Sequence, residues 1–234
     1  MFTVGIVGAG GYLGSALLAA CGKFADRAVV AVTRENYDQR KRDEYDVLIN
    51  CAMPSARFWA KNNPEKDFVE TVQKTADLVY GWNYRKFVQI STVSARCQLD
   101  TVYGRNKAAA EALCASGHLI VRLGAIYDQD MRKGVLIDMI RGNTVFVGGD
   151  SRYCFADRRF VAHWISSNLG RSGIVEVGGR NAISLNAIAE HIGSASTFEG
   201  ALDHQEVETN DPDYPEASDV LTFLDNWKRD SPEN

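Results

Sequence analysis

The stretch Val4-Gly5-Ile6-Val7-Gly8-Ala9-Gly10-Gly11-Tyr12-Leu13-Gly14 decides the fold of this chain. Thr3 to Val7 is a nearly continuous apolar run, as expected of a strand that is buried on both faces. A glycine-rich turn follows the run, and Tyr12 to Phe24 has the apolar spacing of a helix. The stretch therefore predicts a buried strand, a tight turn and the start of a helix.

Strands and helices alternate through the first half of the chain. The crossover from Arg34 to Tyr45 is polar and short, so we expect it to be abbreviated. The remaining predicted elements are strands at 28–33, 46–51, 86–90 and 118–123 and helices at 64–81 and 100–115. Such alternation is typical of a parallel sheet with helices on both faces.

The alternation loosens after about residue 128. There we expect helices at 135–140 and 220–227, and a third helix that begins after an N-cap at Ser184. We also expect strands at 144–147 and 173–177 and a polar loop at 203–213. The predicted fold class is α/β, a Rossmann-like doubly wound parallel sheet with a small C-terminal substrate lobe. We expect one domain over residues 1–234, with the substrate-lobe segments mainly within 128–234.

Composition excludes several functional classes. The chain has 234 residues, 45% hydrophobic and 24% charged, with a net charge of −4, so a broadly nucleic-acid-binding surface is not expected. No apolar stretch is long enough to span a bilayer. The five cysteines are odd in number and widely spaced, and no His/Cys/Asp/Glu cluster has metal spacing. We therefore expect free thiols, no metal and a cytoplasmic location.

The glycine-rich turn is a candidate cofactor cradle. Gly8, Gly11 and Gly14 form a G-x-x-G-x-x-G pattern, with Gly10 as an extra glycine and Tyr12-Leu13 opening the helix. Glycines permit the tight turn and let the backbone approach phosphate, and the helix N-terminus favours an anion. These residues predict a dinucleotide pyrophosphate site; the alternative is a purely structural turn.

The residue that ends the second strand bears on the choice of nicotinamide cofactor. A carboxylate there would favour the free 2′-hydroxyl of NAD, whereas this chain has Thr33-Arg34. The guanidinium of Arg34 can pair with a 2′-phosphate, which predicts NADP, with NAD as the alternative. Arg34 as a solvated surface charge is the competing interpretation.

Tyr103 and Lys107 are the candidate catalytic pair. They are four residues apart, so the phenol and the ammonium share one helix face, about eleven residues after Ile90-Ser91-Thr92-Val93-Ser94. A nearby cation favours phenolate, which would let Tyr103 exchange a proton near neutral pH. Together with a dinucleotide cradle, a Ser/Thr-Tyr-Lys set predicts hydride transfer at a carbonyl or carbinol carbon. The alternative is a packed phenol and a solvated amine.

Four motifs in order carry a resemblance to a known family. They are Asp46-Val47-Leu48-Ile49-Asn50-Cys51-Ala52, Ile90-Ser91-Thr92, the Tyr103/Lys107 pair, and Val121-Arg122-Leu123-Gly124-Ala125-Ile126-Tyr127. Over roughly residues 1–195 the chain resembles the extended branch of the short-chain dehydrogenase/reductase family, the epimerase/dehydratase-like proteins. The stretch from Gly173 to Gly193 resembles the tail of sugar-nucleotide reductases of the 4-dehydrorhamnose reductase type.

The resemblance assigns roles to individual residues. It implies that Tyr103 is the general acid/base, that Lys107 lowers its pKa and binds the nicotinamide ribose, and that Thr92 hydrogen-bonds the substrate oxygen. It further implies additional cofactor contacts. It also implies substrate contacts from the Arg158-Arg159-Phe160-Val161 element and from Ser94, which follows Val93. The added cofactor residues are Cys51 and Ala52, and the added substrate residues are Ser94 and Arg159.

Three departures from the family pattern narrow the function. Val93-Ser94 stands where dehydratases carry an Asp-Glu pair, so 4,6-dehydration is not expected. Thr71 replaces the family's helix asparagine, which puts the usual proton relay in doubt. The chain is also short, so we expect a reduced substrate lobe.

The leading hypothesis is an NADP-dependent reductase of a keto group on a nucleotide-linked sugar, acting as a homodimer through the helices at 64–81 and 100–115. A sugar-nucleotide epimerase that recycles its own hydride is the enzymatic alternative. A non-catalytic dinucleotide-sensing protein on the same fold is the third possibility.

Overall fold

The computed structural model describes residues 1–209 and 211–230, with side chains up to residue 227. The chain forms two compact units. The first comprises Met1–Arg122 and Arg159–Val175, and the second comprises Leu123–Arg158 and Glu176–Asn234. The loop predicted at 203–213 is confirmed for the residues that the structure describes; residue 210 lies outside them.

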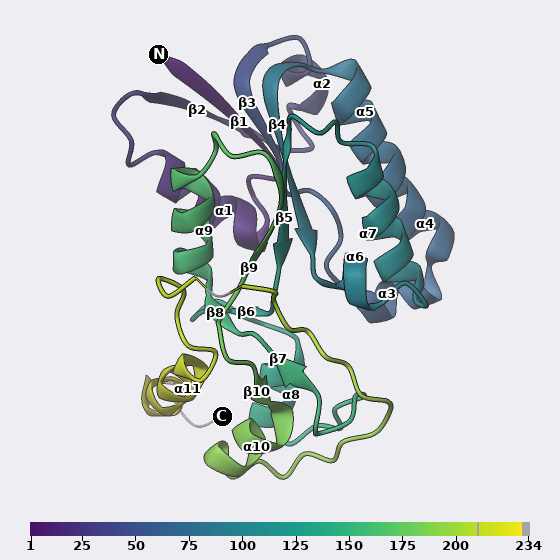
Figure 1. Cartoon of the computed structure of the whole chain (residues 1–234), viewed down its shortest axis with the longest axis vertical. Coiled ribbons are helices and arrows are strands. Elements are labelled where there is room, and N and C mark those ends of the chain that lie inside the picture. Colours follow the sequence, from purple (N-terminus) through teal and green to yellow (C-terminus); the bar gives the residue numbers. More distant parts are fainter. Residues whose placement is uncertain (210, 231–234) are drawn as a thin grey trace. The chain divides into compact units, whose positions relative to one another are not determined.

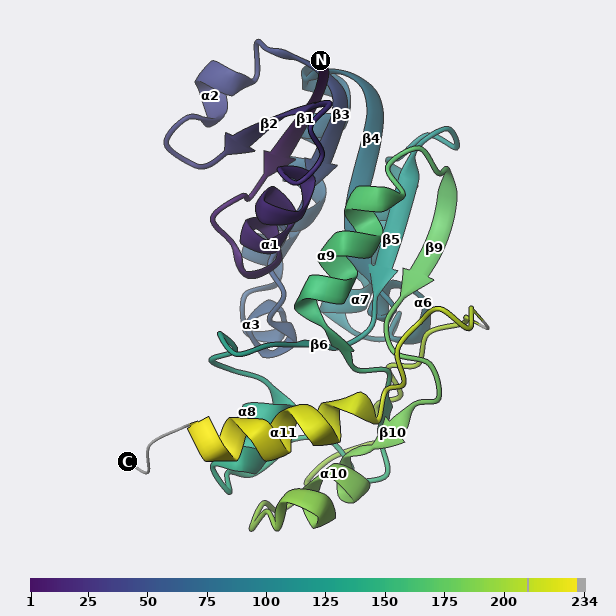
Figure 2. The same ribbon diagram turned by 90° about the vertical axis from the view of Figure 1, so that its left-hand side faces the viewer.

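A six-stranded parallel sheet forms the centre of the fold, in the order β2-β1-β3-β4-β5-β9 (Figure 2). β1 pairs in parallel with β2 and β3, and β3 pairs in parallel with β4. The strands are β1 Phe2–Val7, β2 Arg27–Val32, β3 Glu44–Asn50, β4 Asn83–Thr92, β5 Leu119–Leu123 and β9 Gly173–Val177. The predicted α/β class and every predicted strand of this sheet are confirmed.

Helices cover both faces of the sheet. α1 (Tyr12–Cys21) and α9 (Arg158–Ser167) lie on one face, and α4, η1, α5 and α7 lie on the other (Figure 1). These four are α4 Pro64–Phe68, η1 Val69–Gln73, α5 Lys74–Gly81 and α7 Val102–Ala112. Three short helices complete the connections: α2 Tyr37–Arg40, α3 Arg57–Asn62 and α6 Ser94–Cys97.

The predicted helix at 64–81 has the right extent but a π-helical middle. Over η1 the Thr75 hydroxyl donates to the Thr71 carbonyl at 2.7 Å. The sequence carries no signal for this, since its apolar spacing suits a regular helix. Such π-helical turns are frequent at functional sites. α3 and α9 were likewise not predicted as helices.

The order of the strands determines where a ligand can approach. The second crossover is reduced to α2, as predicted, and β1 lies between β2 and β3. The chain winds in opposite directions from this point, so the carboxyl ends of β1 and β3 border the crevice of an open parallel sheet. The glycine-rich turn after β1 and the segment after β3 therefore meet at this edge.

Apolar side chains from four strands build the core under α5. Val7, Val32, Leu48 and Phe87 pack with Leu78. Burial of such a layer supplies the main driving force for folding and gives the site a rigid base.

The second unit has its own core. Its elements are β6 Ile126–Tyr127, β7 Arg152–Tyr153, β8 Ala156–Asp157, β10 Ile183–Ser184, α8 Val135–Ile140, α10 Leu185–Ile192 and α11 Asp219–Asp230. Leu136, Phe155, Leu185, Ile188 and Leu224 belong to the buried cluster. The Ser184 hydroxyl caps α10 by accepting from the Ala187 N–H at 3.2 Å, as predicted.

The strand predicted at 144–147 is wrong. Only Val145 pairs, in an isolated bridge to Phe198, because its N–H and carbonyl bond to the loop at Thr197 and Glu199. The two-residue strands of this unit are too short to show a sequence pattern.

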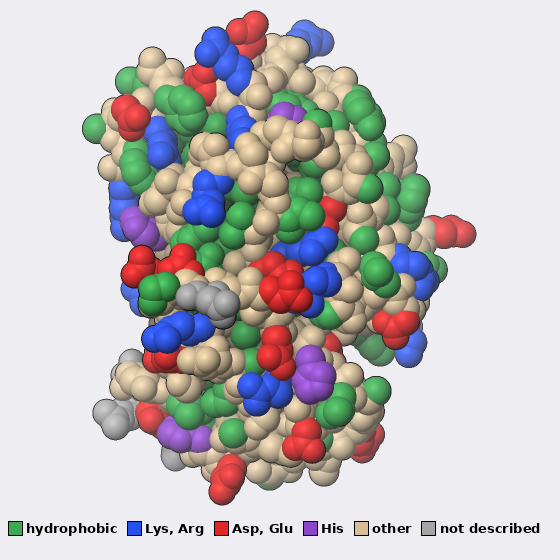
Figure 3. All heavy atoms as spheres, viewed as in Figure 1, with side chains coloured by type: hydrophobic (Ala, Val, Ile, Leu, Met, Phe, Trp, Pro, Cys, Tyr) green, Lys and Arg blue, Asp and Glu red, His purple; other side chains and the backbone are tan. Residues whose placement is uncertain are grey.

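Positive and negative side chains alternate over the face seen in Figure 3. No helix within the described residues is both long and apolar enough to cross a membrane. The described side chains also contain no group of three or more His, Cys, Asp or Glu that could hold a metal ion.

Candidate functional site

The turn after β1 is held against the segment after β3. Gly8 has φ +83°, and a Cβ there would lie 2.8 Å from the Ala52 Cα. A Cβ at Gly14 would lie 2.0 Å from the Gly8 carbonyl oxygen, so α1 packs on the turn through its glycine. Both positions therefore require glycine for space, and Gly8 also for its backbone conformation.

The outer side of the turn is open. A Cβ at Gly10 would meet no atom within 4 Å, and no side chain caps α1 at Gly11. Tyr12 is partly exposed and Leu13 is buried at the first turn of α1. The N–H groups of a first helical turn lack partners within the helix, which suits them to bind an anion.

Cys51 and Ala52, the predicted cofactor contacts after β3, lie beside this turn. The Cys51 N–H donates to the Val7 carbonyl at 3.0 Å, and the Ala52 N–H donates to the Asn50 Oδ1 at 3.2 Å. Burial raises the pKa of the Cys51 thiol to about 12, so Cys51 is not a thiolate at neutral pH. The contribution of Cys51 and Ala52 at this place is one of backbone and shape.

Arg34 is exposed just beyond β2. The turn there is fixed by Asn36, whose Oδ1 accepts from the Thr33 N–H at 2.8 Å and whose Nδ2 donates to the Ala31 carbonyl at 3.1 Å. Its neighbour Glu35 is also exposed, and a hydrogen bond with Thr33 lowers the pKa of the Glu35 carboxyl. A cation and an anion thus follow β2 side by side.

Thr92 and Ser94 lie at the carboxyl end of β4. The Thr92 hydroxyl accepts from the Ser94 N–H at 3.3 Å and donates to the Ser94 Oγ at 3.4 Å. Ser94 is buried and opens α6. Thr92 also hydrogen-bonds the Tyr103 phenol. The structure therefore brings together Thr92, Ser94 and Tyr103.

The start of α7 positions Tyr103 and Lys107. The Thr101 hydroxyl caps the helix by accepting from the Gly104 N–H at 3.0 Å. At the far end of the helix, Glu111 accepts from Ser91 Oγ at 2.6 Å and pairs with Arg122 Nη2 at 2.7 Å. These contacts fix α7 to β4 and β5, so the Tyr103 and Lys107 side chains have a rigid support.

Lys107 connects the catalytic pair to the segment after β3. Its Nζ donates to the Pro54 carbonyl at 2.8 Å and lies 5.1 Å from the centre of the Tyr103 ring. Both side chains are almost completely buried. Because Cys51 and Ala52 contact the glycine-rich turn, the short segment 51–54 joins the cradle to the Tyr103/Lys107 pair.

The prediction that the Lys107 cation favours the Tyr103 phenolate is wrong for this structure. Burial raises the pKa of Tyr103 to about 12, with Arg57 and Thr92 lowering it and Asp67 raising it. Burial also lowers the pKa of Lys107 to about 7, so its ammonium is only partly populated at neutral pH. Tyr103 is therefore a protonated phenol in this state.

Sequence reasoning missed two charged residues beside the pair. Arg57 begins α3, and its charge acts on Tyr103. Asp67 lies in α4, is completely buried and acts on both Tyr103 and Lys107. Arg57 follows the third strand, where a ligand crevice is expected, so its position in the sequence could have identified it as a candidate site residue. Asp67 has the sequence context of an ordinary acidic residue in a first helical turn, so the sequence does not mark it as a site residue.

Thr71, which replaces the family's asparagine, is buried in η1. Its Oγ1 has no hydrogen-bond partner among the described residues. The neighbouring Thr75 hydroxyl instead joins a buried amide pair, accepting from Asn50 at 3.3 Å, while Asn50 also donates to Gln89 at 3.1 Å. This network ties the π-helical turn to β3 and β4.

The two arginines of the Arg158-Arg159-Phe160-Val161 element do not act together. Arg158 pairs with Asp128 and, at 2.7 Å, with Asp130, so its charge is used within the second unit. Arg159 is exposed on α9, which lies with α1 on the face of the sheet opposite α7 (Figure 1). Arg158 is therefore engaged in ion pairs, and Arg159 remains the candidate substrate contact of this element.

The state of Lys107 predicts a pH dependence of stability. Its pKa is about 7 in the folded protein, whereas an unfolded lysine titrates near 10.4. Between these values the unfolded chain binds more protons, so Lys107 makes the folded state more stable as the pH rises, by up to about 1.4 kcal/mol per pH unit. Urea unfolding at pH 7, 8 and 9 measures this contribution.

Lys107→Met should lack this gain. The matched control, Lys66→Met, removes an exposed lysine of α4 and should keep the wild-type dependence on pH. Identical slopes for wild type and Lys107→Met would contradict the buried, weakly basic amine.

Comparisons with known proteins show a likeness of structure without one of sequence. No family model and no curated protein sequence matches the chain. Among solved structures, the chain is similar to a dTDP-4-dehydrorhamnose reductase from Bacillus anthracis in complex with NADP, with a TM-score of 0.74 and 17% identity over 96% of this chain and 99% of that one.

Two further similar structures are those of enzymes that catalyse other reactions. One is an NAD-dependent NDP-hexosamine 5,6-dehydratase of tunicamycin biosynthesis, with a TM-score of 0.76 and 14% identity over 99% of both chains. The other is a UDP-glucuronic acid 4-epimerase from Bacillus cereus in complex with UDP-glucuronic acid and NAD, with a TM-score of 0.68 and 17% identity over 100% of this chain and 95% of that one. At these identities the likeness establishes the fold: the chain has the fold of nucleotide-sugar reductases, dehydratases and epimerases, as the sequence resemblance predicted.

Proposed function

We propose that the chain is a member of the extended short-chain dehydrogenase/reductase family, an NADP-dependent oxidoreductase that reduces a keto group on a nucleotide-linked sugar. One observation carries the proposal. The segment 51–54 contacts the glycine-rich turn at Gly8 and accepts a hydrogen bond from Lys107, so one short segment joins the cradle to the Tyr103/Lys107 pair. The likeness to nucleotide-sugar enzymes supports the substrate class.

The residues of the cradle fit a dinucleotide. The open side of Gly10, the left-handed Gly8 and the uncapped start of α1 leave room and N–H donors for a pyrophosphate. In this proposal Gly10, Gly11, Tyr12 and Leu13 hold the pyrophosphate. Cys51, Ala52, Tyr103 and Lys107 border the nicotinamide ribose, and Ser94 and Arg159 contact the substrate. The nicotinamide, when bound, supplies the hydride.

Tyr103 carries the proton that the proposed reduction uses. Its raised pKa keeps the phenol protonated at neutral pH, which is the form that a carbonyl reduction consumes. When the substrate oxygen takes this proton, a phenolate remains, which the Thr92 hydrogen bond and the charge of Arg57 stabilise. The Lys107 ammonium can then return a proton to Tyr103, leaving a neutral amine, which its lowered pKa favours.

The alternatives differ in their use of the hydride. An epimerase would employ the same residues and return the hydride to the substrate, so it would consume no net cofactor. A non-catalytic sensor has no need of a buried Tyr103/Lys107 pair, which favours the enzymatic proposals. Val93 and Ser94 provide no carboxylate, so the proposal does not include 4,6-dehydration. All five cysteines are free, which supports a reducing compartment such as the cytoplasm.

Replacing Tyr103 by phenylalanine tests the catalytic assignment. Tyr103→Phe removes the proton donor but keeps the ring, so turnover should fall on the order of a hundredfold or more while NADPH binding changes little. Steady-state NADPH oxidation with a panel of keto-sugar nucleotides, and cofactor titration, measure the two effects.

The control is Tyr84→Phe, which removes a hydroxyl that donates to the Val79 carbonyl at 2.8 Å in the same unit. It should keep wild-type turnover. Normal turnover in Tyr103→Phe would remove Tyr103 from the mechanism.

Arg34→Ala tests the preference for NADP. A charge-assisted pair with the 2′-phosphate contributes on the order of 1.5–3 kcal/mol, so NADPH binding should weaken roughly tenfold or more and NADH binding should not change. Arg42→Ala, which removes another exposed arginine of the same crossover, is the control. Equal losses for both cofactors would show that Arg34 does not read the phosphate.

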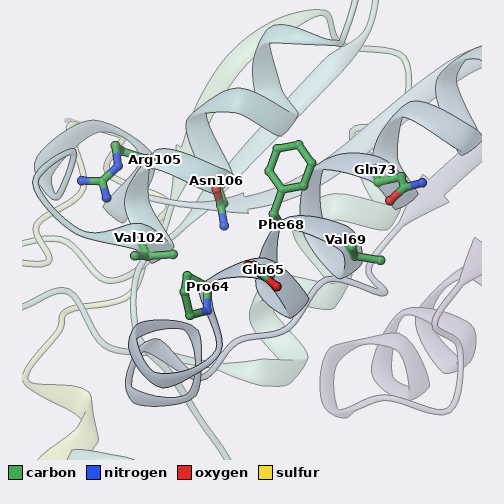
Figure 4. A pocket seen from close by; sticks show the side chains of 8 residues that line it. All are labelled: Pro64, Glu65, Phe68, Val69, Gln73, Val102, Arg105 and Asn106. Carbon is green, nitrogen blue, oxygen red and sulfur yellow. The ribbon is translucent and has the colours of Figure 1, made fainter.

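We also propose a homodimer through the outer face of α4, η1 and α7. A groove between these elements is lined by Pro64, Glu65, Phe68, Val69, Gln73, Val102, Arg105 and Asn106 (Figure 4). Phe68 and Val69 are each about half exposed there, at 49% and 48%. Of the small residues of α7, Ala109 and Ala112 are exposed, whereas Ala110 is buried within its own unit.

Light scattering should therefore give about twice the chain mass. Phe68→Lys should yield monomers, because it would bury a charge in the apolar contact. Phe58→Lys, a change of an exposed phenylalanine outside the groove, should leave the dimer intact. A wild-type monomer at micromolar concentration would reject this interface.

A further inference from the structure

Asp67 is a buried carboxylate that the proposed mechanism does not yet use. It is 0% exposed and lies in α4, which packs on α7. Its Oδ2 accepts from the Asn106 Nδ2 at 2.8 Å, whereas its Oδ1 has no hydrogen-bond partner among the described residues. Thr71, one turn further along, also buries an unpartnered Oγ1. Two polar atoms at helical spacing thus lie inside the protein without partners.

A buried carboxylate with one free oxygen requires a compensating charge. Removing an ion from water costs several kcal/mol unless an opposite charge and hydrogen bonds replace the lost hydration. α7 contributes Lys107 and Tyr103, and α3 contributes Arg57, whose charge acts on Tyr103. The segment after β3 contributes the Pro54 carbonyl, and the charges of η1 and α5 nearest in sequence, Glu70 and Lys74, pair with each other at 2.9 Å.

Lys107 is the cation on which Asp67 acts. Its Nζ is held by the Pro54 carbonyl, an uncharged acceptor that leaves its charge uncompensated. Asn106, the residue that binds Asp67, directly precedes Lys107 in α7. The carboxylate of α4 is therefore hydrogen-bonded to the residue next to Lys107 in α7, and both charged side chains are buried.

We propose that Asp67 is the buried counter-ion of Lys107, a positioning residue that keeps Lys107 in its ammonium form behind Tyr103. The catalytic part of this inference rests on the proposed reductase function, whereas the pairing of charges does not. Asp67 touches neither substrate nor reacting atoms and acts through Lys107 and Tyr103.

One carboxylate affects both protons of the pair. Its negative charge raises the pKa of Lys107, against the larger effect of burial, and it also raises the pKa of Tyr103. Both effects keep protons on the pair: an ammonium at Lys107 and a phenol at Tyr103. That is the protonation state from which a carbonyl is reduced, so Asp67 extends this state to higher pH.

Asp67→Asn removes the charge while keeping an acceptor for Asn106. The direct measurement is an NMR titration of the Lys107 side chain in protein free of cofactor, with its signal assigned by comparison with Lys107→Met. The account predicts a lower pKa for Lys107 in Asp67→Asn than in wild type. Asp100→Asn, which removes an exposed carboxylate just before α7, should leave it unchanged.

Activity provides the second readout. Deprotonation of Lys107 should end the reduction at high pH, so the basic limb of the kcat/KM profile should move to lower pH in Asp67→Asn. A displacement of one pH unit lowers kcat/KM about tenfold on that limb and leaves the acidic side unchanged. A uniform loss at every pH would assign Asp67 a structural role only and would overturn the catalytic part.

A double-mutant cycle covers the case in which the NMR signal is not resolved. Lys107→Met should destabilise the wild-type background more than the Asp67→Asn background, because it leaves the buried carboxylate without its counter-ion. Equal losses, or an unchanged pKa of Lys107 in folded Asp67→Asn, would overturn the pairing. Failure of the wild type to reduce any keto-sugar nucleotide would reject the proposed function. The NMR titration and the double-mutant cycle would then still test whether Asp67 is the counter-ion of Lys107.

Discussion

The close approach of the glycine-rich turn to the segment after β3 is the constraint on which the rest of the site depends. Gly8 takes a left-handed conformation against Ala52, and the next residues of that segment reach the Pro54 carbonyl that holds Lys107. The parallel pairing of β1 with β3 sets this distance. A side chain at Gly8 would separate the two segments and displace the cradle from the Tyr103/Lys107 pair at once.

Burial then sets the chemistry of the pair. The low dielectric of the interior disfavours charge, so it raises the pKa of Tyr103 and lowers that of Lys107. The two shifts place the pKa of the amine below that of the phenol, which favours the return of a proton from the Lys107 ammonium to a Tyr103 phenolate. The nearby charges act in opposite directions on the phenol: Arg57 lowers the pKa of Tyr103 and Asp67 raises it.

Much of the fold was readable from the sequence because the strands are short apolar runs, and β1, β3 and β5 are buried over most of their length. The turn at Gly8 to Gly14 and the helical spacing of Tyr103 and Lys107 are local signals, and local signals survive without tertiary context. The π-helical turn at Val69–Gln73 and the two-residue strands of the second unit depend on long-range contacts, and they were missed. The predicted effect of Lys107 on the pKa of Tyr103 was wrong for the same reason. Spacing indicates that Lys107 faces Tyr103, but only the packing of α4 and α3 reveals how deeply both are buried.

The central claim is that Tyr103 donates a proton while the nicotinamide supplies a hydride to a sugar carbonyl. The most direct measurement is the transfer of deuterium from NADPH labelled at the transferable position to the product, with the purified wild-type protein and keto-sugar nucleotides. The account predicts one deuterium at the new carbinol carbon for each NADPH consumed. Product formed without deuterium, or formed without net consumption of NADPH, would contradict it.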